Sequence, residues 1–112
     1  MHPHSNDDLV RARALLIDVA TRGDRITYTD FAARLGLGWN HKLQRDRNLL
    51  SKLLFEVSHQ EYGMGRPLLT AVVIRKGLDT PGKGFLGLEG FPKTKQFWEI
   101  ELKRTHDFWR WR

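Results

Sequence analysis

Apolar residues recur at helical spacing in the first part of the chain. Four of them lie three or four residues apart: Leu9, Ala12, Leu16 and Val19. Side chains at this spacing share one face of a helix, which can then pack on a core. Ser5 and Asp8 resemble a capping box at the start, and Gly23 is a typical residue after a helix end. The pattern predicts a helix from about Asn6 to Arg22.

A short strand and a second helix are predicted next. Residues 26–28 are β-formers, but the piece is too short for more than a minor strand. Thr29 can cap a helix through residues 30–35, which ends at the following glycine. Phe31 and Leu35 then face inward. Residues 37–40 would form the turn of a helix-turn-helix.

The run from Trp39 to Glu61 has two different faces when it is placed on a helix. The apolar face contains Leu43, Leu50, Leu54 and Val57, and the opposite face contains His41, Arg45, Asn48 and Lys52. One face suits a core, and the other is rich in donors and positive charge. The sequence leaves two possible starts for this helix. Asp46 is an alternative N-cap, and His41 and Lys42 would then belong to the preceding turn of the helix-turn-helix. The helix should end near Tyr62–Gly63.

A β-hairpin is predicted after this helix. The run LLTAVVI, residues 68–74, is almost continuously apolar, which is typical of a strand covered on both sides. Arg75 and Lys76 end it, and the glycine-rich loop GLDTPGKG at 77–84 leads into a return strand at Phe85, Leu86 and Leu88. A basic hairpin directly after a helix-turn-helix is interpreted as a wing.

The C-terminal segment fits two patterns. Trp98, Ile100 and Leu102 alternate with charged residues as in a strand, whereas Trp98, Leu102, Thr105 and Trp109 fit a helical stripe. We expect a helix over 94–107, because Thr94 can cap it. The fold class expected is therefore α+β, a winged helix-turn-helix with three helices, a small β-hairpin wing and a C-terminal helical extension. Its organisation would be a disordered N-terminus at 1–5, the winged-helix domain at 6–92, and a helix with an aromatic tail at 93–112 packing on that domain.

Composition narrows the choice of partners. The chain has 112 residues, 40% of them hydrophobic, which suits one domain with its own core. A net charge of +6 makes nucleic acid the first generic partner and an acidic protein surface the second. The absence of cysteine excludes disulfides, cysteine nucleophiles and thiolate zinc sites. No apolar run approaches the roughly 20 residues that cross a bilayer, so we expect a soluble, cytoplasmic protein.

The charged face of the third helix suits DNA. Arg45, Arg47 and Asn48 can offer two hydrogen bonds to a base edge. The residues better suited to phosphate are Lys42, Lys52, Arg75, Lys76 and Lys83. The alternative is that this is only the solvated side of an amphipathic helix and an ordinary surface turn.

No motif indicates an active site. The loop at 77–84 differs from a phosphate-binding P-loop, because Lys83 is followed by Gly84 and a predicted strand. The histidines have no spacing typical of a metal site, and Glu56 and Glu61 are expected as surface helix residues. We therefore expect no catalysis, no cofactor and no metal. Trp98 and Trp109 are expected in the core or as a lid, whereas Trp111, between two arginines, could anchor a partner.

The order of elements carries a family resemblance. The segment from Thr27 to Ala32 matches the pattern T-Y-x-D/E-hydrophobic-A, and with the basic helix and glycine-bearing hairpin the chain resembles the DNA-binding domain of the alkylguanine-DNA alkyltransferases. It looks closest to the small non-enzymatic alkyltransferase-like proteins. The resemblance implies that Tyr28 lies near DNA, and that Arg47, or Asn48 with a shift of one residue, takes the place of the family's base-displacing arginine.

The chain departs from that family at its substrate motif. The family has P-C-H-R, or P-W-H-R in the alkyltransferase-like members, where this chain has Arg66-Pro67-Leu68-Leu69-Thr70. Without the cysteine and its histidine partner, alkyl transfer is excluded. What the resemblance implies is a fold and a binding face.

The functional prediction is a non-catalytic winged-helix protein that binds double-stranded DNA in a regulatory, mobile-element or defence role. The third helix would enter the major groove and the hairpin at 75–85 would lie against the backbone. The alternative is a protein-binding module, such as an immunity protein or inhibitor, whose basic face and aromatic tail meet an acidic protein partner.

Overall fold

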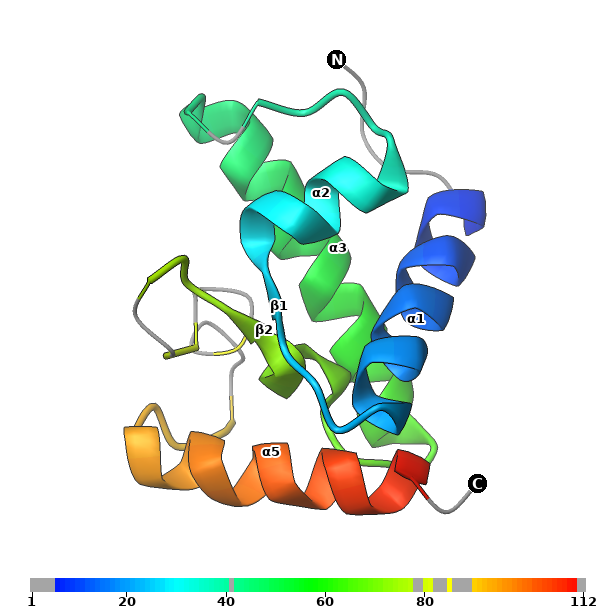
Figure 1. The fold of residues 1–112 in the computed structure, drawn as a ribbon, viewed down its shortest axis with the longest axis vertical. Helices are drawn as coiled ribbons and strands as arrows, with labels where there is room; N and C mark the ends of the chain where they lie inside the picture. Colours follow the sequence, from blue (N-terminus) through cyan, green and yellow to red (C-terminus); the bar gives the residue numbers. More distant parts are fainter. Residues whose placement is uncertain (1–5, 41, 78–79, 82–84, 86–89, 111–112) are drawn as a thin grey trace.

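The helices of the protein pack around one short buried segment, residues 68–73 (Figure 1). The computed structural model describes residues 6–40, 42–77, 80–81, 85 and 90–110. In chain order the elements are α1 (Asn6–Thr21), β1 (Ile26–Thr27), α2 (Tyr28–Leu35), α3 (Gln44–Gly63), the 3-10 helix η1 (Leu69–Val72), β2 (Val73–Ile74) and α5 (Lys95–Arg110). The described part is thus mostly helical, with four α-helices and a two-stranded parallel sheet. None of its helices has the length and apolar composition needed to cross a membrane.

The central segment is not the strand that its apolar run predicts. Residues 69–72 form η1, and of this run Val73 and Ile74 form a strand. A short apolar run has the same pattern in a buried strand and in a buried helical turn, so periodicity cannot separate the two. Here α1, α3 and α5 all pack against η1, and a tight turn presents side chains to all three. The prediction of a strand over 68–74 is therefore wrong for most of its length.

The small sheet joins two segments that are far apart in sequence. β1 pairs with β2 in parallel, with Ile26 opposite Val73 and Thr27 opposite Ile74. Beyond this pair, the described residues contain one antiparallel bridge, between Ile74 and Pro81. The first strand of the predicted hairpin is thus paired mainly with β1.

The return strand of the predicted hairpin is contradicted at the one position that can be checked. Phe85, its expected first residue, has a helical backbone and is buried against Phe97, with ring centroids 5.8 Å apart. Leu86, Leu88 and most of the glycine-rich loop lie outside the described residues, as does the N-terminal segment 1–5.

The first two helices lie close to their predicted positions. α1 ends one residue before the predicted boundary. The cap of α2 is Thr27, whose hydroxyl accepts a hydrogen bond from the Asp30 amide at 3.2 Å. The prediction that Thr29 caps this helix is therefore wrong, because the extended backbone of Thr27 already aims its hydroxyl at the first turn. Gly36 ends α2 with a φ of 66°, as predicted.

α3 begins at Gln44, between its two predicted starts. Asp46 lies inside the first turn and is not the N-cap. Leu50, Leu54 and Val57 are buried as predicted, but Leu43 precedes the helix and is 46% exposed. Because the helix starts after Leu43, the predicted apolar stripe does not extend to this residue.

The C-terminal segment is helical, as expected, and α5 extends to Arg110. The Thr94 hydroxyl accepts a hydrogen bond from the Phe97 amide at 3.1 Å, which confirms the predicted cap. Trp98 is buried and its Nε1 donates to the Ala71 carbonyl at 2.8 Å. Trp109 is partly buried against the main core, so both tryptophans pack as predicted. Trp111 lies outside the described residues.

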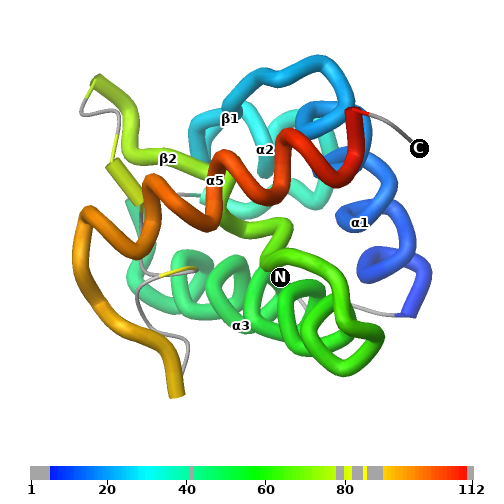
Figure 2. The backbone as a smooth tube through the Cα atoms, turned by 90° about the horizontal axis from the view of Figure 1, so that it is seen from below, coloured from blue at the N-terminus to red at the C-terminus, as the bar shows by residue number. Residues whose placement is uncertain are grey.

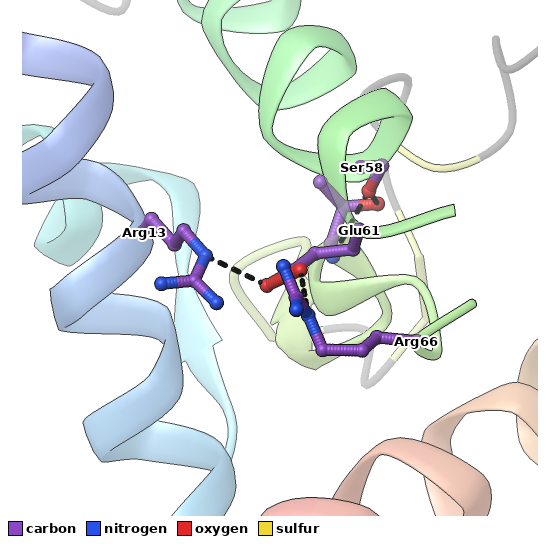
Figure 3. A network of polar contacts seen from close by, with 5 residues as sticks. Arg13, Ser58, Glu61 and Arg66 are labelled. Atoms are coloured by element: carbon purple, nitrogen blue, oxygen red, sulfur yellow. Dashed lines mark hydrogen bonds and ion pairs between the residues drawn. The ribbon is translucent and has the colours of Figure 1, made fainter. Parts of the chain in front are cut away.

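A buried carboxylate joins α1 to α3 (Figure 3). Glu61 has no exposed surface; its Oε1 accepts from Arg13 Nε at 2.9 Å, and its Oε2 accepts from Arg66 Nε. The Arg13 guanidinium also lies 5.7 Å from the ring centre of Trp109 on α5. The expectation that Glu61 is a surface residue is wrong, because two arginines, one of them 48 residues away in sequence, neutralise it inside the fold.

Replacing Glu61 should test this connection. Glu61→Gln leaves two partly buried guanidinium groups without their carboxylate, so we expect the free energy of unfolding to fall by about 2–4 kcal/mol in urea denaturation. Glu99→Gln is the matched control, since Glu99 is 59% exposed and its ion pair with Lys95 is 4.0 Å long. The control should lose no more than about 0.5 kcal/mol. Equal losses in the two variants would contradict a structural role for Glu61.

Candidate nucleic-acid interface

The first turns of α3 form an exposed basic surface. Its described members are Lys42, Arg45, Arg47, Asn48 and Lys52, all exposed to solvent. We call this set the α3 basic face. Figure 1 shows that these turns lie at one end of the molecule, while α5 runs along the other end. The buried side of α3, from Leu50 onward, packs into the core, so the helix is held by its later turns and presents its earlier ones.

Short-range hydrogen bonds fix the entry into α3. The Asp46 carboxylate accepts from the Asn40 amide at 2.8 Å, and the Asn40 side-chain oxygen accepts from the Lys42 amide at 2.9 Å. The Leu43 amide donates to the Asn40 carbonyl at 2.9 Å. Bonds of this kind replace the missing helical partners at a helix start. The described residues before α3 are therefore bonded to one another and to its first turn.

Three polar side chains on the first two turns of α3 form a hydrogen-bonded chain. Arg47 Nη2 donates to Gln44 Oε1 at 2.6 Å, and Gln44 Nε2 donates to Asn48 Oδ1 at 2.8 Å. The spacing of three and four residues makes these side chains neighbours on the helix surface. Gln44 is not among the contact residues predicted from the sequence, although its spacing from Arg47 and Asn48 is the signal that would have identified it.

Three cations of this face, Arg45, Lys42 and Lys52, have a long ion pair or none among the described residues. Arg45 is 71% exposed, and its Nε lies 3.7 Å from a carboxylate oxygen of Asp46. Among the described residues, no carboxylate forms an ion pair with Lys42 or Lys52. Exposed lysines can meet a phosphate without first breaking a salt bridge.

The other predicted contact residues are not gathered at this face. Arg75 and Lys76 are exposed in the turn after β2. Figures 1 and 2 together show this turn on the same flank as the first turns of α3 but apart from them. Tyr28 begins α2 and is partly buried against the main core. His41 and Lys83 lie outside the described residues.

The two larger hollows of the described surface lie away from the α3 basic face. One, of about 430 Å³, lies along α5, where Lys103 and Asp107 form an ion pair at 2.8 Å. The hydrogen bond from Lys103 lowers the pKa of the Asp107 carboxyl. The other, of about 420 Å³, lies between α2 and Trp39. Neither is lined by a group of His, Asp and Glu suited to hold a metal ion, and the described residues contain no such group.

Comparisons with models of known protein families, with curated proteins and with solved structures give no match to this chain. A function for this chain is therefore inferred from the chemistry of its surface. On the α3 basic face, exposed charge, donor groups and a hydrogen-bonded helix start occur together.

The Asp46 contact should control the order of the segment before α3. Asp46→Ala removes the acceptor for the Asn40 amide, so the free energy of unfolding should fall by about 1–3 kcal/mol and this amide should exchange faster with solvent. Asp46→Asn keeps an acceptor oxygen and should lose less on both measures. Hydrogen exchange of the Asn40 amide, together with urea denaturation, checks the prediction. Unchanged exchange in Asp46→Ala would contradict it.

Proposed function

We propose that this protein binds double-stranded DNA through the α3 basic face and catalyses no reaction on it. The observation that carries the proposal is the presence of four exposed cations and an asparagine on or just before the first turns of one helix. Phosphates attract such a surface because binding releases condensed counterions. The first turns of a recognition helix are also the part that reaches base edges in the major groove.

We further propose that the fold is a variant of the winged helix-turn-helix. In support, α2 and α3 are joined by residues 36–43, and β1, between α1 and α2, pairs with the strand that follows α3. The segment 36–43 that joins α2 to α3 is longer than the 3–4 residues usual in a helix-turn-helix, which is why we describe the fold as a variant. The turn after β2, which carries Arg75 and Lys76, would take the place of a wing. The resemblance to the alkyltransferase-like proteins agrees with a DNA-binding role, and a regulatory, mobile-element or defence setting remains our proposal for the biology.

The proposed DNA contacts fall into two groups, those suited to base edges and those suited to phosphates. Arg45, Arg47 and Asn48 suit base edges, since a guanidinium or an amide can form two directed bonds. Lys42 and Lys52 suit phosphate, where a point charge is sufficient. Arg75 and Lys76 would contact the backbone at a second position, because the turn after β2 lies apart from the first turns of α3 (Figures 1 and 2).

The rival proposal is a module that binds an acidic protein through the basic face and the aromatic tail. The packing of Trp109 against the main core and Arg13 weakens it, because this part of the tail is used inside the fold. Trp111, another aromatic residue of the tail, lies outside the described residues. We therefore favour DNA.

Single lysine replacements should locate the binding surface. Lys52→Ala removes one phosphate contact, so the slope of log K against log salt should become shallower by about 0.9, and binding to every duplex should weaken. Lys95→Ala removes the same charge from α5, at the other end of the molecule, where Lys95 is 67% exposed. This control should leave the slope unchanged. Fluorescence anisotropy with a labelled duplex at several salt concentrations measures both, and equal effects of the two replacements would contradict the assignment to α3.

A further inference from the structure

We infer that Gln44, Arg47 and Asn48, which we call the donor triad, select guanine over adenine at the base pair they meet. The inference rests on the proposed DNA binding and adds a sequence preference to it. Its basis is the direction of the two hydrogen bonds within the triad.

Arg47 fixes the orientation of both amides. A guanidinium only donates hydrogen bonds, so the Gln44 atom that lies 2.6 Å from Arg47 Nη2 must be the oxygen. The Gln44 amide nitrogen then faces Asn48 and donates to it at 2.8 Å. The Asn48 atom at this contact must be its oxygen, because two amide nitrogens cannot share a hydrogen bond. The bond from Gln44 thus occupies one of the two lone pairs of the Asn48 oxygen, whereas both hydrogens of the Asn48 NH2 group are left for a ligand.

This arrangement changes which base suits Asn48. Adenine is usually read by an asparagine that accepts from N6 and donates to N7. With one lone pair held by Gln44, Asn48 offers a base mainly donors, and reading adenine would require its oxygen to accept a second hydrogen bond while it stays bound to Gln44. Guanine presents two acceptors, N7 and O6, in the major groove. A surface that offers donors therefore fits guanine and disfavours adenine.

The position of the triad supports readout of a base edge. All three residues are exposed on the first two turns of α3, and before them the Asn40 amide donates to Asp46 and the Lys42 amide donates to Asn40. Side chains that already hold one another lose less conformational freedom when they bind. The triad thus has the exposure and the order that discrimination between bases requires.

The test is selection of duplexes from a randomised DNA library, followed by sequencing, with the full-length protein. The wild type should enrich a motif in which one position favours guanine over adenine by about fivefold or more, the lower end of what one two-bond contact contributes. Gln44→Ala releases the Asn48 oxygen, so this ratio should fall by at least about threefold. Lys95→Ala is the control, and its ratio should equal that of the wild type.

Gln44→Glu should reverse the base preference, whereas Gln44→Ala should only weaken it. A carboxylate still accepts from Arg47 but cannot donate to Asn48, so the Asn48 amide should turn, donate to the carboxylate and expose its oxygen. The preference should then move toward bases that donate in the major groove, adenine and cytosine. Gln44 is exposed, so both variants should keep the unfolding free energy of the wild type within about 0.5 kcal/mol.

The outcomes separate the two proposals. Salt-dependent binding without a guanine preference, or a preference unchanged in both Gln44 variants, overturns the role of the triad and leaves DNA binding standing. Absence of binding to any duplex at low salt overturns the proposed function, and this inference with it. A guanine preference that weakens in Gln44→Ala and reverses in Gln44→Glu supports both.

Discussion

The buried Glu61 carboxylate is the contact on which the arrangement of the helices depends. A charge with no exposed surface is tolerated only when it is paired and hydrogen-bonded, and Arg13 of α1 and Arg66 after α3 meet this condition together. The Arg13 guanidinium also lies over the ring of Trp109, so the contacts around Glu61 extend to α5. Because the later turns of α3 are held in this way, its first turns keep a fixed position at the far end of the molecule (Figures 1 and 3).

The core is completed by side chains that bond to the backbone of the central segment. Glu101 accepts from the Leu68 amide at 2.9 Å, and Thr105 donates to the Leu68 carbonyl at 3.1 Å. Trp98 donates to the Ala71 carbonyl. In a wide sheet, neighbouring strands would satisfy these buried polar groups. Here the side chains of α5 do so, which explains how the segment can form a 3-10 turn in place of a strand.

The sequence predicts the local elements better than the contacts between them. Periodic apolar residues and caps identify the helices, and Thr94 and Gly36 act at their ends as expected. The strand at 68–74 could not be separated from a helical turn, since both bury every side chain. Glu61 lies four residues after Val57 on the buried face, a position that the sequence does show, but its arginine partners depend on the tertiary fold. Of the site, the charged residues of α3 were predicted, whereas the Gln44 bonds were not.

We propose that DNA binds at the first turns of α3. The most direct measurement is a titration of the isotope-labelled protein with an arbitrary duplex, followed by amide chemical shifts in two-dimensional NMR. If DNA binds at the first turns of α3, the largest changes should fall within residues 42–52, with smaller ones at 75–76 and little change along α5. Changes concentrated between Lys95 and Arg110, or none at low salt, would contradict it.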